Sequence, residues 1–250
     1  SPDDAGSWHV GRAGMRYRDL IPDRLGGRFV ASHIHIPEGG PVPDYVHFHQ
    51  VRFQMIFCRR GWARLVYEDQ GEPFLLEAGD CVLQPPRIRH RVLESSDDLE
   101  VIEIGCPAIH ETIADPSTSL PTGLVDPGRD FGGQRFVRHR AATAVWEPWR
   151  IDGFEARAIG FADATDGLAE ARVVRPNGIP AAVAVTHRAE FVFAFVLDGS
   201  VHLRTDDHGD HRLGPGDSVV LPSGCAYRFD GPSADLELLE VTLPAVVTTT

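Results

Sequence analysis

The chain contains an internal repeat, in which the same pattern of glycine, aspartate and proline residues occurs twice with the same spacing. The matching positions keep their separations to within one residue, and they are Gly61, Gly79, Asp80 and Pro85 in the first copy and Gly199, Gly216, Asp217 and Pro222 in the second. A repeat of this length indicates two structural units of the same kind. We place these units at residues 17–107 and 156–244, with an N-terminal arm at 1–16, a linker at 108–155 and a tail at 245–250.

Both copies are rich in short apolar or alternating runs that end at Gly, Pro or Asp. Such runs are typical of β-strands, and short strands at regular spacing favour a sandwich or a barrel, so we predict an all-β protein. Residues 53–57 (FQMIF) and 191–197 (FVFAFVL) are apolar on both strand faces. We expect both faces of these strands to be covered, by the other copy, by the linker or by the second subunit of a homodimer.

The net charge of −12 argues against nucleic acid and against an anionic membrane surface as partners. No run of 18 apolar residues is present to span a bilayer. The four cysteines form no CxxC pair, and a chain of 250 residues needs no disulfides to fold. We therefore expect reduced thiols and a cytoplasmic protein. The partner that we expect is a small-molecule substrate.

A histidine pair, His47 and His49, stands out in the first copy. Residues two apart on a strand point to the same face, so both imidazoles can converge on one metal ion. Gln54 follows at odd parity and needs an intervening turn to reach that face. Taken alone, such a pair is equally consistent with packed or surface histidines that bind no metal.

His90 adds a third candidate ligand from a distant strand. On that strand the alternation places His90 with Ile88 and Val92 on one face, and the three arginines at 87, 89 and 91 on the other. The arginines can be solvated while His90 points inward. The parity therefore favours His90 as a ligand over a surface position.

These residues give the chain a specific resemblance. It resembles a bicupin, a protein with two tandem cupin domains, through a first motif (Gly39/Gly40, His47, His49, Gln54 and Gly61) and a second motif (Gly79, Asp80, Pro85 and His90). The resemblance covers both copies and implies two jelly-roll-like barrels of the double-stranded β-helix type, with the metal inside the first. Two positions depart from the family pattern: Gln54 stands where a glutamate is usual, and Arg87 where a glycine is common.

The resemblance implies one divalent metal ion per chain, bound by His47, His49 and His90. Gln54 either contributes its amide oxygen as a further ligand or only lines the pocket. Imidazole ligands suit Fe, Zn, Ni, Mn and Cu alike, and we favour Fe(II). Neutral ligands leave the ion its full charge, which can hold an anionic substrate or activate water.

In the second copy the ligand positions read Val185, His187, Val192 and Tyr227. Valine cannot bind a metal, so we expect a degenerate site there and a structural or ligand-gating role. The chemistry should lie in the first copy.

Two residues near the first site are candidates for a catalytic role. Arg52 lies between the ligands and can pair with a substrate carboxylate, although a solvated arginine is the simpler interpretation. His33 and His35 form a second pair on one strand face, and His35 can act as a base or a substrate contact. A structural pair is the alternative.

We expect an enzyme, because a three-histidine site leaves positions open for a substrate and for O2 or water. The first hypothesis is a metal-dependent dioxygenase acting on a small polar or anionic metabolite. A redox-neutral isomerase or lyase is the second, and a non-catalytic cupin that senses a small molecule or metal is the third.

Overall fold

The structure is a computed structural model that describes residues 8–11, 14–180 and 183–250. The chain divides into two compact units between Ala142 and Thr143, within the 3₁₀ turn η3 (Ala141–Thr143). Residues 108–142 of the predicted linker thus belong to the first unit and 143–155 to the second. Residues 1–7 and 12–13 of the predicted N-terminal arm lie outside the described residues. Among the described residues, no helix is long and apolar enough to cross a membrane.

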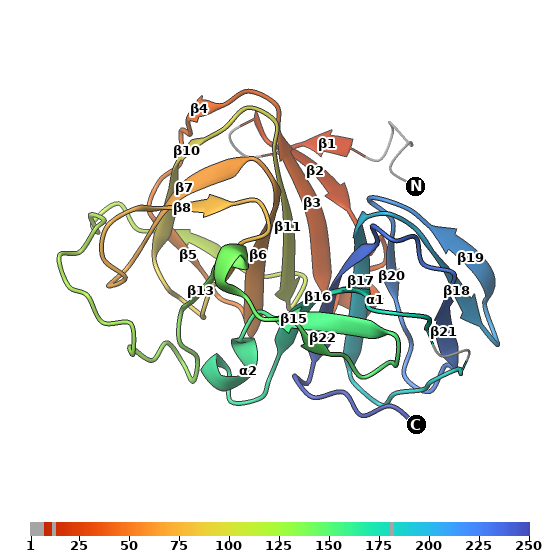
Figure 1. Ribbon diagram of the computed structural model, residues 1–250. Coiled ribbons are helices and arrows are strands. Elements are labelled where there is room, and N and C mark those ends of the chain that lie inside the picture. Colours follow the sequence, from red (N-terminus) through yellow and green to blue (C-terminus); the bar gives the residue numbers. More distant parts are fainter. Residues whose placement is uncertain (1–7, 12–13, 181–182) are drawn as a thin grey trace. The chain divides into compact units, whose positions relative to one another are not determined.

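The first unit consists of two antiparallel sheets (Figure 1). In spatial order, the strands of the larger sheet are β1 (Trp8–Val10), β2 (Arg16–Asp19), β3 (Val30–Ile36), β11 (Leu99–Cys106), β6 (Phe53–Arg60), β9 (Cys81–Leu83) and β13 (Val137–His139). Those of the other sheet are β12 (Thr112–Ala114), β5 (His47–His49), β10 (His90–Ser95), β7 (Trp62–Tyr67) and β8 (Phe74–Glu77), with β4 (Gly40–Pro41) beside β10. The short helix α1 (Arg24–Gly27) precedes β3.

The second unit also has two antiparallel sheets. One runs in the order β14 (Glu147–Pro148), β15 (Phe154–Ala158), β16 (Glu170–Pro176), β22 (Glu237–Leu243), β17 (Phe191–Asp198) and β20 (Ser218–Val220). The other runs β19 (Gly209–Leu213), β18 (Val201–Thr205) and β21 (Tyr227–Asp230). Helix α2 (Phe161–Ala164) lies between β15 and β16, and the Glu170 carboxylate accepts hydrogen bonds from the backbone N–H groups at its start.

The two units share one strand order, as the repeat predicts. The order β3-β11-β6-β9 in the first unit corresponds to β16-β22-β17-β20 in the second. The matching segments 98–104 and 235–241 lie in and just before β11 and β22, so equivalent residues occupy equivalent strands. The prediction of an all-β protein with two tandem units is confirmed.

Two equivalent glycines show why the spacing recurs. Gly61 has φ +76° and Gly199 φ +68°, in the left-handed region that favours glycine. A Cβ atom would lie 2.3 Å from Ser96 Oγ at Gly61 and 2.5 Å from Ser233 Oγ at Gly199. These serine hydroxyls accept hydrogen bonds from the backbone N–H groups of Trp62 and Ser200. Each glycine therefore permits the same close turn.

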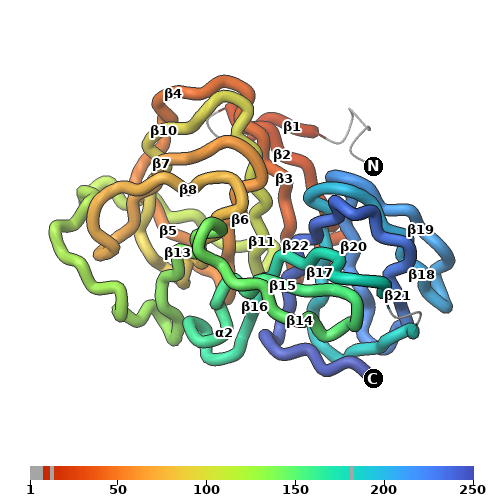
Figure 2. Tube along the Cα trace, viewed as in Figure 1, coloured from red at the N-terminus to blue at the C-terminus, as the bar shows by residue number. Residues whose placement is uncertain are grey.

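The loop between β12 and β13 is the main irregular part of the first unit (Figure 2). Charged contacts hold this loop, since Arg129 forms ion pairs with Glu68 and Asp69, which follow β7 directly. Asp69 also accepts a hydrogen bond from Thr122, and Phe131 packs into the apolar core of the barrel. The loop is thus fixed to the barrel wall.

Candidate metal centre

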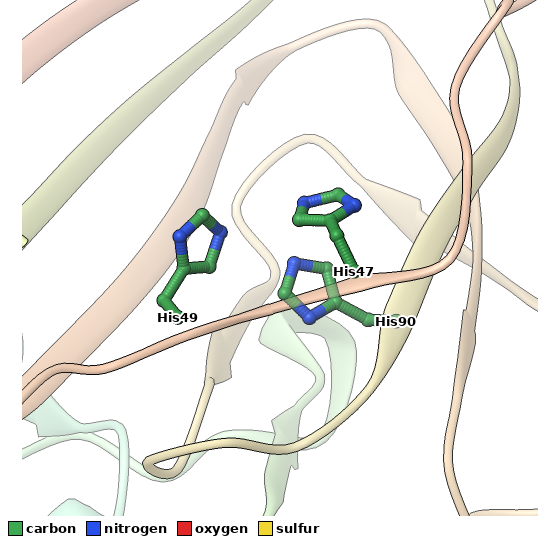
Figure 3. A group of neighbouring side chains, drawn as sticks. All are labelled: His47, His49 and His90. Atoms are coloured by element: carbon green, nitrogen blue, oxygen red, sulfur yellow. The ribbon is translucent and has the colours of Figure 1, made fainter. Parts of the chain in front are cut away.

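Strand pairing brings three histidines together. His47 and His49 point to the same face of β5, and β10 pairs with β5 so that His90 lies directly opposite His47. Figure 3 shows the three side chains gathered into one group. Their candidate ligand atoms lie within 4.8 Å of one another, and the ring centroids are 4.4 to 5.3 Å apart.

Hydrogen bonds orient each imidazole. His47 Nδ1 lies 2.8 Å from the Tyr45 carbonyl oxygen, and His90 Nδ1 lies 3.0 Å from that of Ile88. A carbonyl only accepts, so both rings carry their proton on Nδ1 and the lone pair on Nε2. His49 Nδ1 is 3.0 Å from the Thr112 hydroxyl.

The buried Asp44 carboxylate lies 3.7 Å from His47 Nδ1 and accepts a hydrogen bond from the Val92 backbone N–H. A carboxylate or carbonyl behind a ligating histidine fixes its tautomer and raises its basicity. The donor set, its spacing and these supporting bonds therefore fit a divalent metal ion held by His47, His49 and His90.

Gln54 lies in a chain of buried side chains beside the histidines. The Tyr67 hydroxyl donates to Gln84 Oε1 (2.7 Å), Gln84 Nε2 donates to Gln54 Oε1 (3.2 Å), and Gln54 Nε2 donates to Glu103 Oε1 (2.5 Å). Gln84 Nε2 also lies 3.4 Å from His90 Nε2. In this arrangement the Gln54 amide oxygen binds Gln84, so a metal would have to share or displace that bond. Burial raises the pKa of the Tyr67 hydroxyl, which keeps it a donor.

The histidines line a cavity of about 420 Å³ between the two sheets. Both sheets contribute apolar side chains to its wall, among them Ile34, Ile56, Leu65, Val92 and Val101. The polar lining residues include the three histidines, Gln54, Gln84, Tyr67 and Glu103, and no arginine or lysine is among the described residues that line it. This volume lies within the range of about 300–1,000 Å³ that is typical of small-molecule sites.

The two residues predicted to act in the reaction do not line this cavity. Arg52 is exposed, with its backbone bonded to Cys106 and Gln134. On β3, Ile34 and Ile36 line the cavity, so His33 and His35 point to the opposite face. There His33 bonds Glu100 (2.9 Å) and His35 lies 3.3 Å from Asp98. The structure brings neither Arg52 nor His35 to the histidine group, and we assign neither to the site.

The cysteines offer no nucleophile at the site. All four are free and buried, and burial raises the pKa of the Cys58 thiol to about 12. A thiol with that pKa is almost fully protonated near neutral pH and is unreactive.

The turn before His90 keeps its shape despite the arginine. Arg87 has φ +65°, and its backbone N–H donates to the His49 carbonyl (2.9 Å). The equivalent Gly224 has φ +81°, and its N–H donates to the His187 carbonyl (2.8 Å). The same turn therefore ties the histidine strand in both units, and in the first unit a non-glycine residue adopts the left-handed conformation.

The second barrel contains a cluster of buried apolar side chains. Its core includes Trp149, Val192, Leu221, Tyr227 and Leu238, and these residues come from both sheets and the segment before β15. His187 Nε2 lies 3.1 Å from the Leu221 carbonyl, and its Nδ1 accepts from the Ala189 N–H. Burial lowers the pKa of His187, which favours the neutral ring. Both ring nitrogens thus have structural partners.

An ion pair lies beside the position equivalent to His90 in this barrel. Arg150 donates two hydrogen bonds to the Glu240 carboxylate and a third to the Tyr227 hydroxyl (3.2 Å). The guanidinium also lies over the Trp149 ring. Tyr227 occupies the position equivalent to His90, and Glu240 that equivalent to Glu103.

The fold and the histidine group define a two-domain cupin protein, and comparison with known sequences agrees. The cupin domain pattern matches residues 32–105 and 173–242, so the chain belongs to the cupin family. No curated protein matches the sequence. The predicted bicupin architecture is confirmed.

Solved structures share this fold at low sequence identity. A mutant of Bacillus subtilis oxalate decarboxylase superposes with TM-score 0.68 and 12% identity over 97% of this chain and 76% of that chain. Lactobacillus farciminis oxalate decarboxylase with formate gives 0.67 and 14% over 97% and 85%. A mutant of salicylate 1,2-dioxygenase from Pseudoaminobacter salicylatoxidans gives 0.66 and 13% over 90% and 74%. At such identity these likenesses support the fold alone.

Sequence reasoning did not single out Glu103, Gln84 or Asp44. A signal for Glu103 was present, because the repeat aligns it with Glu240 and places both acidic residues at the inward parity of their strands. Asp44 and Gln84 lie outside the aligned motif positions, and only the folded chain shows that they contact the site.

Proposed function

We propose that the chain is a metal-dependent cupin enzyme and that its first barrel is a dioxygenase site. The observation that carries this proposal is the convergence of three histidines, each oriented by a bond at Nδ1, on the wall of a largely apolar cavity. Three protein ligands leave coordination positions open for reactants. The second barrel, in which two of the equivalent ligand positions are Val185 and Val192, is then a structural unit.

Fe(II) held by His47, His49 and His90 would supply the redox chemistry that O2 requires. The protein's own contribution is to bind and orient the substrate against the histidine face and to exclude bulk water with the apolar wall. In a dioxygenation both oxygen atoms enter the product, so the substrate supplies the electrons and no separate reductant is needed. Mn(II) is the competing ion, and Mn(II) centres are described for the Bacillus subtilis oxalate decarboxylase.

The test is O2 consumption by protein reconstituted anaerobically with Fe(II), over a panel of one-ring and two-ring compounds. His49→Ala is the matched variant, because it removes one ligand and leaves the cavity in place. We expect about one Fe per chain and substrate-dependent O2 uptake in the wild type only, with label from ¹⁸O2 in the product. Metal binding without O2 uptake would contradict dioxygenation.

A redox-neutral isomerase or lyase is the second candidate. The Glu103 carboxylate lines the same cavity as the histidines and can act as a general base toward a bound substrate. Product formation without O2, lost in Glu103→Gln, would favour this function. Metal binding with no turnover of any kind would favour a sensor.

A further inference from the structure

The second unit contains a small cavity in addition to its apolar core. The cavity has a volume of about 200 Å³, and the residues that line it all belong to this unit. Its apolar wall consists of Pro148, Ala156, Ala158, Val246 and Val247. Pockets for drug-sized ligands measure about 300–1,000 Å³, so this cavity suits a smaller compound.

Two arginines, Arg150 and Arg172, line the same cavity. Their side chains are 14% and 21% exposed, and the buried Glu240 carboxylate is bonded to Arg150 and lies 3.8 Å from Arg172. In the described part of the chain neither arginine has another ion-pair partner, and Arg172 otherwise donates to neutral oxygen atoms. The remaining carboxylate of the wall, Glu147, is exposed to water. Two partly buried cations thus share one buried anion, and a bound anion would offset the excess charge.

The cavity wall also contains two hydrogen-bond donors that lack an acceptor. Trp149 Nε1 and Arg150 Nε are both shielded from bulk water, and neither has a hydrogen-bond partner in the part of the chain that the structure describes. The Arg150 guanidinium lies over the Trp149 ring, 4.2 Å from its centre, so the two donors are neighbours. A buried N–H group without an acceptor costs free energy. An acceptor bound in the cavity can remove that cost, because both side chains line it.

Charge, donors and apolar wall together define the class of ligand. A carboxylate carries one negative charge and has about four acceptor sites, so it can serve neighbouring donors and an arginine at once. A short aliphatic chain on that carboxylate would bury apolar surface against the alanines and valines of the wall. Inorganic phosphate or sulfate has no such chain, and a neutral alcohol does not offset the charge.

We propose that the second barrel binds a small monocarboxylate with a short apolar chain in this cavity. The carboxylate accepts from Trp149 and Arg150 and lies against Arg172, and the chain packs on the apolar wall. This site is independent of the histidine group in the first barrel. It adds the binding of a small anion to the structural role of the second barrel.

The test compares three probes with the same chain, butyrate, 1-butanol and butylammonium, which are anionic, neutral and cationic. Binding is measured by titration calorimetry on the full chain at constant ionic strength. Trp149→Phe removes the indole N–H and keeps an aromatic ring, and Arg172→Gln removes one cation from the cavity wall. Arg204→Gln is the matched control, since it removes an arginine from exposed ion pairs with Asp210 and Asp230.

A further variant, His90→Ala, distinguishes the two barrels, because a carboxylate can also bind a metal ion held by the histidine group. Circular dichroism verifies that each variant is folded. The two cavity variants change different groups, so the test does not depend on either one alone.

We expect one butyrate per chain, bound at least about tenfold more tightly than 1-butanol or butylammonium, since hydrogen bonds to a charged acceptor are the stronger kind. Trp149→Phe and Arg172→Gln should each weaken butyrate binding about tenfold, whereas Arg204→Gln and His90→Ala should bind it as the wild type does. Equal affinity for the three probes, no saturable butyrate binding, or an affinity unchanged in both cavity variants would overturn the inference. Loss of binding in His90→Ala would place the carboxylate in the first barrel and would equally overturn it.

Discussion

The two barrels of this protein each contain an inward-pointing glutamate, but the surroundings of its carboxylate differ. Both place a glutamate inside a small β-barrel, and both have to offset the cost of removing its charge from water. In the second barrel Arg150 bonds the carboxylate beside a cluster of buried apolar side chains, whereas in the first the carboxylate lines a cavity together with three histidines. With the function proposed for the first barrel, the duplicated fold divides stability and chemistry between its two copies.

Removal of Arg150 tests the stabilising half of this comparison and has the largest expected effect. Arg150→Ala leaves the Glu240 carboxylate buried without its main partner, so we expect the free energy of unfolding to fall by about 3–5 kcal/mol. Urea denaturation measures it. Glu94→Gln in the first barrel, which removes one partner of an exposed ion pair with Arg64, should change stability by less than about 1 kcal/mol.

A paired variant separates charge from packing. Arg150→Met combined with Glu240→Met replaces the ion pair by apolar side chains, and we expect it to recover most of the lost stability. If the double variant is as unstable as Arg150→Ala, the pair contributes through its shape and its contacts with Tyr227 and Trp149 rather than through charge balance.

Removal of His90 tests the chemical half. We expect His90→Ala to weaken metal binding by at least about 100-fold, since even groups behind a ligand contribute 10–100-fold. Elemental analysis and competition with a chelator measure this loss. His187→Ala, at the position equivalent to His49, is the matched control and should leave the metal content unchanged. Metal loss from that variant would place a site in the second barrel and break the comparison.

Much of this division could be predicted from the sequence. The glycines, aspartates and prolines of the repeat fix turns that only a narrow range of residues can make, so their spacing indicated the two barrels. The histidine group followed from strand parity and the matching motif. Turns and parity are local properties, which is why they can be inferred without a structure.

What the sequence could not predict depends on long-range contacts. The pair His33 and His35 share a strand face, but only the partners Glu100 and Asp98 reveal that this face is the outer one. Arg150 lies in the predicted linker, and nothing in its local sequence indicates that it reaches Glu240, 90 positions away. The role of Arg52 was inferred from its place between the ligands in the sequence, and that of His35 from a shared strand face; neither observation fixes which way a side chain points in the folded barrel.

The outer face of the first barrel also gives a pH prediction. A hydrogen bond from His33 and the charge of Arg59 lower the pKa of Glu100 to about 2, while burial lowers the pKa of His33. A carboxyl whose folded pKa is depressed stabilises the fold above its ordinary value near 4.5 and loses that contribution as the pH falls toward 2. We therefore expect stability to decline over this window, and Glu100→Gln to flatten the decline.

Thermal unfolding between pH 6 and pH 2.5 measures this effect, over about the range in which the carboxyl titrates. The matched control is Glu237→Gln at the equivalent position of the second unit, since none of the ion pairs in the described part of the chain involves Glu237. An equal change in the slope for both variants would assign the effect to overall charge rather than to the Glu100 contacts.

The smallest expected change in stability concerns the turn at Arg87 and at its equivalent Gly224. Arg87 and Gly224 adopt the same left-handed conformation and donate to equivalent carbonyls. Because a side chain at positive φ costs about 1 kcal/mol, Arg87→Gly should be neutral or slightly stabilising, partly offset by the lost contact of the guanidinium with Phe48. Gly224→Ala should cost about 1 kcal/mol in the same urea assay. A large loss of stability in Arg87→Gly would mean that the arginine does more in the first barrel than complete the turn. A change in metal affinity would indicate that it acts through the His49 carbonyl, to which its backbone N–H is bonded.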